Sequence, residues 1–183
     1  MVDTSKALIV YGTRFGATAN TSEEIAKIFR QQGLETDVVD AKKQKIKDIA
    51  SYNLVVVGSG IQVNRWTGEP EEFTKKFRNE LSNKKVALFV CCGSASLSKS
   101  NRLEEANEMK IKYLDQKAAQ LGVMPISLGY FGGVVNYNKT PWWAKRAMEV
   151  DRPRIEATFN ATEPGIYDLR DWDEIRTWAT ELA

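Results

Sequence analysis

The chain has 183 residues, which is enough to bury one substantial core and fits a single domain. Hydrophobic residues make up 43% and charged residues 27%, a balance unlike that of a disordered chain, and the net charge of +2 predicts no nucleic-acid partner. Because there is no histidine, Ser-His and Cys-His catalysis and zinc binding through imidazole are excluded. We therefore expect any reaction to depend on a cofactor.

The compartment is indicated by features that the sequence lacks. The polar N-terminus shows no secretory signal pattern, and no apolar run approaches the ~18 residues that span a bilayer. Cys91 and Cys92 are adjacent, so they are poorly placed for an intrachain disulfide and are expected to be inert buried thiols. These features predict a cytoplasmic protein.

Strands and helices are expected to alternate along one domain that spans residues 1–183. The strands are short apolar runs without alternation, typical of a parallel sheet that is covered on both faces. In chain order we expect a strand at 7–11, a helix at 18–32, strands at 35–39 and 54–57, a helix opening at Pro70, a strand at 86–90, a helix at 102–121, a strand at 126–131 and a helix at 172–182. This order predicts an α/β fold with a doubly wound parallel sheet.

The stretch 134–168 breaks this alternation. It has no clear strand and is dense in proline, asparagine, basic and aromatic residues. A connection of this length in a compact domain is usually functional or mobile. We expect it to form a long insertion before the C-terminal helix.

The first loop with chemical potential follows the first strand. It consists of Thr13, Arg14, Phe15, Gly16, Ala17 and Thr18. Small residues let backbone N–H groups approach a phosphate, threonines add hydroxyl donors, and the helix N-terminus adds a favourable dipole. The alternative is that Gly12 and Gly16 only permit a tight turn, and the loop matches neither a Walker A nor a GxGxxG motif.

Two further loops would meet the first one at the carboxyl ends of the strands. The loop after the third strand contains Ser59, Gly60, Ile61, Gln62, Val63, Asn64, Arg65 and Trp66. Trp66 could stack on a planar ring of a cofactor or could pack beside the next helix. The loop after the fourth strand, which could close on the other side of such a ring, contains Cys92, Gly93, Ser94 and Ala95.

The run from Ile9 to Thr18, continuing to Ile25, resembles the flavodoxin signature, with Ser22 where that signature usually has alanine. The resemblance implies a five-stranded sheet of order 2-1-3-4-5 and flavin mononucleotide (FMN) as cofactor. It implies that the 13–18 loop binds the FMN phosphate. It also implies that the flavin ring contacts Ser59 to Asn64, Trp66 and Cys92 to Ala95.

The C-terminal part is similar to the flavodoxin-like subfamily that includes the menaquinone-dependent protoporphyrinogen oxidases. The similarity lies in Gly132, Gly133, Tyr137, Lys139, Trp142, Trp143, Lys145 and the stretch 168–178. In that subfamily the insertion is tied to substrate and membrane contact, which implies peripheral membrane contact through 134–154. The alternatives are that Trp142 and Trp143 pack on the sheet and that the basic residues form a solvated face, namely Lys139, Lys145, Arg146, Arg152 and Arg154.

Three functions remain open at this point, so the sequence leaves it open whether the chain is an enzyme. The first is a flavodoxin-type electron carrier that docks redox protein partners. The second is an FMN-dependent oxidoreductase of the quinone-dependent protoporphyrinogen oxidase type, favoured by a pI near 8.4 and by Arg65 if it lies near the flavin. The third is a module that kept the fold and lost the cofactor. No general acid, general base or metal ligand is assigned.

Overall fold

The computed structural model describes residues 5–139 and 142–183, apart from the side chains of Trp143, Ala144 and Ala147. Five parallel strands form the central sheet in the order β2-β1-β3-β5-β6. They are β1 (Lys6–Gly12), β2 (Glu35–Asp40), β3 (Leu54–Gln62), β5 (Lys85–Cys91) and β6 (Ser127–Phe131). The prediction of a doubly wound sheet is confirmed, with one addition, the short strand β4 (Arg65–Trp66), which pairs antiparallel with the end of β3.

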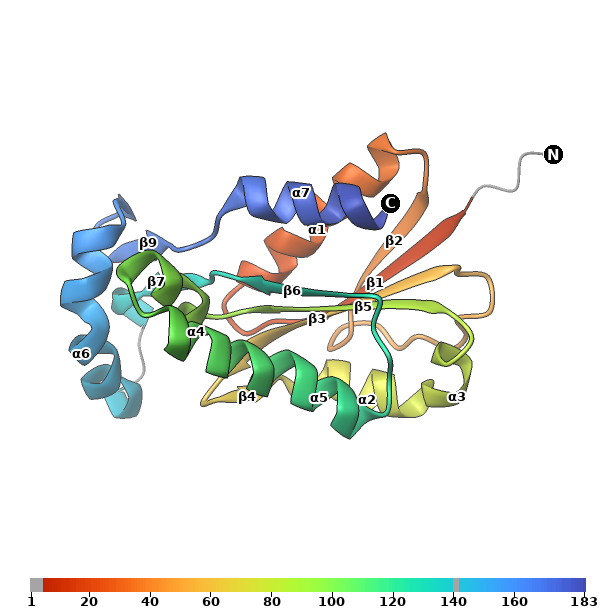
Figure 1. Ribbon diagram of the computed structural model, residues 1–183, viewed down its shortest axis with the longest axis horizontal. Coiled ribbons are helices and arrows are strands. Elements are labelled where there is room, and N and C mark those ends of the chain that lie inside the picture. Colours follow the sequence, from red (N-terminus) through yellow and green to blue (C-terminus); the bar gives the residue numbers. More distant parts are fainter. Residues whose placement is uncertain (1–4, 140–141) are drawn as a thin grey trace.

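Helices cover both faces of this sheet (Figure 1). One face carries α1 (Ala17–Gln31) and α7 (Trp172–Leu182). The other carries α2 (Gly68–Lys76), α3 (Arg78–Leu81), α4 (Leu103–Lys110) and α5 (Gln116–Leu121). The helix expected at 102–121 is interrupted by a π-helical turn, η2 (Ile111–Asp115), and the loop after β5 forms the 3-10 helix η1 (Gly93–Ser100).

The apolar strands fill two hydrophobic cores, one under each helical layer. In β1, Leu8 and Val10 join the core beneath α2 to α5, whereas Ala7 and Ile9 join the core beneath α1 and α7. Successive side chains of a strand point to opposite faces, so a strand between two helical layers needs apolar residues throughout. This explains why the strands read as continuous apolar runs.

The insertion has its own secondary structure, so the expectation of no clear strand in 134–168 was wrong. It contains β7 (Val134–Asn136), η3 (Tyr137–Lys139), α6 (Trp142–Thr158), β8 (Ala161–Glu163) and β9 (Ile166–Asp168). The three strands form an antiparallel sheet of order β7-β9-β8. Strands of three residues are too short to show a periodicity.

The insertion lies beyond the carboxyl ends of the central strands (Figure 1). Arg154 connects α6 to η1, because it donates a hydrogen bond to the hydroxyl of Ser96 at 3.2 Å. Its side chain is only 13% exposed and also pairs with Asp151 within α6 at 2.5 Å. The interpretation of Arg154 as part of a solvated face was therefore wrong, whereas Lys139, Lys145 and Arg146 are exposed. Within the described ranges, no helix has the length and apolar character needed to cross a membrane.

Candidate functional site

A cavity of about 90 Å³ opens at the carboxyl ends of β1, β3 and β5, and we call it the sheet-end cavity. All three loops singled out in the sequence reach it. The residues that line it are Thr13, Arg14, Phe15, Ala17, Thr18, Gly60, Ile61, Gln62, Thr67, Cys91, Cys92, Gly93, Gly133 and Val134. Ligands of open α/β sheets bind at this edge, where the strand order reverses.

Free backbone donors lie where the β1–α1 loop enters helix α1. Gly16 adopts a left-handed φ of 91°, and its N–H donates to the hydroxyl of Thr13 at 3.0 Å. The first helical bond of α1 runs from Asn20 to the carbonyl of Gly16, and within the described residues no side chain caps this helix end. The amides of Ala17 and Thr18 are therefore available to an anion, and the positive end of the helix dipole strengthens them.

Glycines let the backbone of β3 approach this loop closely. A Cβ on Gly60 would lie 3.2 Å from the hydroxyl of Thr18, which is buried. A Cβ on Gly12 would lie 2.2 Å from the hydroxyl of Thr67, and one on Gly133 would lie 3.5 Å from the backbone of Cys92. Gly12 is thus required by the packing of Thr67 and Pro70 against β1. At Gly60 and Gly133 the missing Cβ leaves backbone and hydroxyl groups uncovered at the cavity, which suits a phosphate.

Two guanidinium groups lie beside the loop, and each is paired with a carboxylate. Arg14 binds Glu69 through two contacts of 3.0 and 3.2 Å, and although burial alone would raise the pKa of Glu69, the bonds it accepts lower that pKa overall. Arg170 is only 5% exposed, contacts Asp168 at 2.7 Å and donates to the carbonyl of Ala17 at 3.1 Å. Backbone and hydroxyl donors thus remain the main means of holding an anion.

The two cysteines are free and buried, as expected. Burial raises the pKa of Cys91 to about 12 and also raises the pKa of Cys92. Both side chains are therefore protonated thiols at neutral pH, which makes them unreactive. They serve as part of the cavity wall.

Seven of the predicted site residues do not line the sheet-end cavity, and their role stays a prediction: Gly16, Ser59, Val63, Asn64, Trp66, Ser94 and Ala95. The hydroxyl of Ser59 is buried and accepts a bond from the Thr67 amide at 3.0 Å. Trp66 is only 5% exposed, and its indole N–H donates to the carbonyl of Tyr113 at 2.8 Å. The structure thus favours the packing alternative for Trp66.

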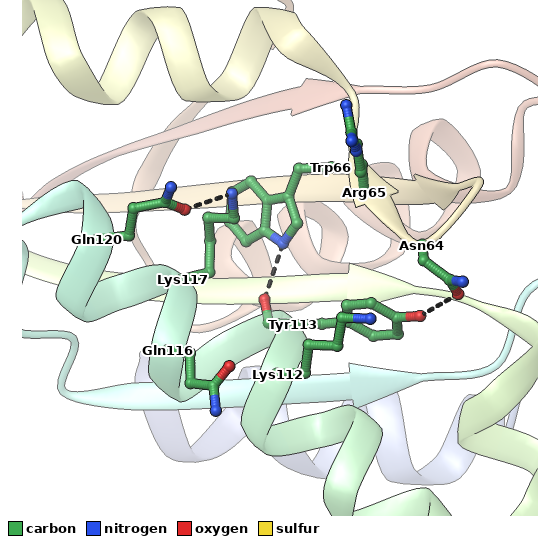
Figure 2. Close-up of a pocket in the computed structure, with 8 residues that line it drawn as sticks. All are labelled: Asn64, Arg65, Trp66, Lys112, Tyr113, Gln116, Lys117 and Gln120. Carbon is green, nitrogen blue, oxygen red and sulfur yellow. Dashed lines mark hydrogen bonds between the residues drawn. The ribbon is translucent and has the colours of Figure 1, made fainter.

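Sequence reasoning missed four residues of the lining: Thr67, Cys91, Gly133 and Val134. Thr67 lies at the cavity because β4 pairs antiparallel with the end of β3. Val134 lies there because the insertion starts at this edge of the sheet. Arg65 does not line this cavity but lies with Asn64 and Trp66 at a second one (Figure 2). The Gly132-Gly133 pair was the one local signal for this part of the wall.

A doubly wound α/β sheet with amide donors and a glycine cradle at its carboxyl edge defines a nucleotide-binding protein of the open-sheet class. A family model described as "Flavodoxin domain" matches residues 8–152, most of the chain. The chain therefore belongs to the flavodoxin-domain family and is an FMN-binding, flavodoxin-like redox protein.

Comparisons with individual proteins agree with this family. Protoporphyrinogen IX dehydrogenase [quinone] of Escherichia coli K12 is 21% identical over 97% of this chain and 94% of its own length. The protein of that name from Leishmania major is 24% identical over 97% of this chain and 74% of its own length. The flavodoxin of Megasphaera elsdenii superposes with a TM-score of 0.55 at 17% identity, covering 96% and 98% of the two chains. Flavodoxin 1 of Bacillus cereus superposes with a TM-score of 0.52 at 19% identity, covering 82% of this chain and 95% of its own. At these identities the two structures support the fold alone.

Proposed function

We propose that the sheet-end cavity holds the FMN phosphate on the 13–18 loop and that the chain works as a flavodoxin-type electron-transfer protein. The observation that carries the proposal is that helix α1 starts at the cavity without a side-chain cap, with Thr13, Ala17 and Thr18 in the lining. Bound FMN accepts and donates one or two electrons.

The chain's own residues hold and orient the cofactor. The loop amides and the two threonine hydroxyls bind the dianionic phosphate, which is the anion best suited to a helix N-terminus. Gly60, Ile61 and Gln62 at the end of β3 and Cys92 and Gly93 after β5 line the cavity, so these segments would border the flavin ring. Arg14 keeps its pairing with Glu69 and fixes the loop against α2.

The test is an absorbance spectrum of the purified protein followed by titration of the apoprotein with FMN. Hydrogen bonds to a charged group contribute about 1.5–3 kcal/mol each, so Thr13→Ala combined with Thr18→Ala should weaken FMN binding at least about 100-fold. Thr177→Ala combined with Thr180→Ala, on the exposed face of α7, is the matched control and should bind FMN as the parent does. An unchanged affinity in the loop variant would overturn the assignment.

A second candidate function is that of an FMN-dependent oxidoreductase with a quinone as electron acceptor. The observation in its favour is that the quinone-linked dehydrogenases match 97% of the chain, including the insertion. On α6, Trp142 is 87% exposed and Val150 is 80% exposed, so Trp142 does not pack on the sheet, while the Trp143 side chain lies outside the described residues. These apolar groups fit the peripheral membrane contact expected for 134–154 in a cytoplasmic protein.

Turnover decides between the two candidates. The FMN-loaded protein is mixed with a quinone and with protoporphyrinogen, and oxidation of the latter is followed by porphyrin fluorescence. Turnover that depends on the quinone would establish the oxidoreductase. Absence of turnover in a protein that binds FMN and passes electrons to a redox protein would leave the carrier function.

A further inference from the structure

Arg170 lies in the short segment between β9 and α7, where the insertion ends, and it reaches the start of α1. Its side chain is only 5% exposed. The Nη1 atom donates to the carbonyl oxygen of Ala17 at 3.1 Å, although 153 positions separate the two residues in the sequence. Ala17 is the first residue of α1 and lines the sheet-end cavity. A buried side chain from the end of the chain thus contacts the helix end to which we assign the FMN phosphate.

The guanidinium of Arg170 is held in one orientation. Its Nε and Nη2 atoms donate to the two carboxylate oxygens of Asp168 at 2.8 and 2.7 Å, and such a bidentate pair fixes the plane of the group. The guanidinium carbon also lies 4.2 Å from the centroid of the Trp172 ring. The bond from Nη1 to Ala17 therefore has a fixed direction, which the single ammonium of a lysine could not reproduce.

The two ends of the insertion set the position of Arg170. The amide of Leu169 donates to the carbonyl of Gly133 at 2.9 Å, and Gly133 lines the sheet-end cavity. A Cβ on Gly132 would overlap the carbonyl oxygen of Leu169, so this close approach requires a glycine. The segment that carries Arg170 is thus fixed beside the cavity by backbone contacts that do not depend on the arginine side chain.

The bond to Ala17 acts on the amide of Thr18. The Ala17 carbonyl and the Thr18 N–H belong to one trans peptide unit, which is planar, so a carbonyl of fixed direction also fixes the direction of the N–H. Hydrogen bonds in series polarise one another, so a cation at the carbonyl makes the N–H a stronger donor. Thr18 lines the sheet-end cavity, whereas Arg170 does not.

We propose that Arg170 is a positioning residue for the phosphate of FMN and acts through the Ala17–Thr18 peptide unit. It directs and polarises the Thr18 N–H without contacting the phosphate. Because Asp168 balances its charge, Arg170 changes the direction and strength of this donor rather than the net charge of the site. This inference rests on the proposed function, since it requires a phosphate at the start of α1.

The test compares FMN with riboflavin, which lacks the phosphate, in titrations of the full-length apoprotein followed by flavin fluorescence. The quantity measured is the dissociation constant of riboflavin divided by that of FMN. Because hydrogen bonds to a charged group are strong, Arg170→Met should lower this ratio at least about tenfold and change the riboflavin affinity less than about threefold. The matched control is Arg176→Met, which removes the exposed pair of 2.6 Å between α7 and Glu24 of α1 and should leave both affinities unchanged.

A second variant keeps the test decisive if circular dichroism shows that Arg170→Met does not fold. Arg170→Lys keeps the charge and can bond either Asp168 or Ala17, but it lacks the fork, so it should lower the ratio at least about threefold.

Two results would overturn the inference alone. One is an unchanged ratio in the folded Arg170 variant, or an equal loss of affinity for both flavins, which a merely structural role would produce. The other is an equal fall of the ratio in Arg176→Met. A parent protein that binds the two flavins equally would overturn the phosphate site as well, so the two failures are distinguishable.

Discussion

The two cavities beside the β3–β4 hairpin are built in different ways. The sheet-end cavity is made of backbone amides, glycines and buried hydroxyls, and the guanidinium that lines it, Arg14, is already paired with Glu69. The second cavity, which we call the basic cavity because Arg65, Lys112 and Lys117 line it, is formed by side chains from the β3–β4 hairpin and from the η2–α5 segment. Within the part of the chain that the structure describes, Arg65 and Lys112 form no ion pair, whereas Lys117 pairs with Glu71. The first is thus built from groups that cannot move freely, whereas most side chains at the second are exposed to solvent.

Rigidity at the sheet-end cavity is tested most strongly at Gly12. A Cβ there would meet the Thr67 hydroxyl at 2.2 Å and the Pro70 ring at 2.7 Å, neither of which can move freely. Because overpacking typically costs 1–3 kcal/mol, we expect Gly12→Ala to lower the free energy of unfolding by about 2–3 kcal/mol in urea titrations. Gly68→Ala, which meets open space, is the control and should change it by less than about 0.5 kcal/mol. Equal effects would show that the edge is not rigid.

The Arg170–Asp168 pair tests whether the bond from Arg170 to the Ala17 carbonyl stabilises the start of α1. Arg170→Met removes the partner of Asp168 and the bond to the Ala17 carbonyl, and we expect a loss of about 2 kcal/mol. Burial would raise the pKa of Asp168, but the bonds from Arg170 lower it below its ordinary 3.8. The stabilisation is therefore complete above about pH 4 and is lost as the pH falls through the lowered pKa.

Denaturant titrations at pH 7 and pH 3 measure this effect. The difference between the parent and Arg170→Met should shrink at pH 3. Arg176→Met, which removes an exposed pair with Glu24, should cost less than about 1 kcal/mol. A loss for Arg170→Met that is as small as the loss for Arg176→Met would contradict a role in holding the helix start.

The smallest effect is expected at the turn of the β3–β4 hairpin. Val63 is 68% exposed and has a φ of 48°, so Val63→Gly relieves strain without removing packing. We expect a gain of about 0.5–1 kcal/mol in thermal or urea unfolding. Val63→Ala keeps a Cβ and should gain less. A loss of stability in Val63→Gly would show that the side chain makes contacts of its own.

Sequence reasoning reached the sheet-end cavity because its parts are local. Thr13 to Thr18 join a buried strand to a helix, and a glycine in that position predicts both the turn and the free amides. Gly60 and Gly93 could be placed at the same edge because parallel strands end together. The strand order followed from the family resemblance.

Features that depend on tertiary pairing could not be predicted in the same way. The side chain of Trp66 looks equally suited to stacking or packing in the sequence, and only the bond to the Tyr113 carbonyl assigns it to the core. The strands of the insertion are three residues long and exist because β9 pairs with both β7 and β8. The basic cavity combines side chains far apart in the chain, such as Arg65 and Lys112, so no local pattern marks it.

The most direct test of the account is the affinity of the apoprotein for FMN relative to riboflavin, which has the same ring and no phosphate. If the start of α1 binds the phosphate, the apoprotein should bind FMN at least about 100-fold more tightly than riboflavin, because riboflavin cannot form the two or more charge-assisted hydrogen bonds to the phosphate. Equal affinities for the two flavins would contradict the account.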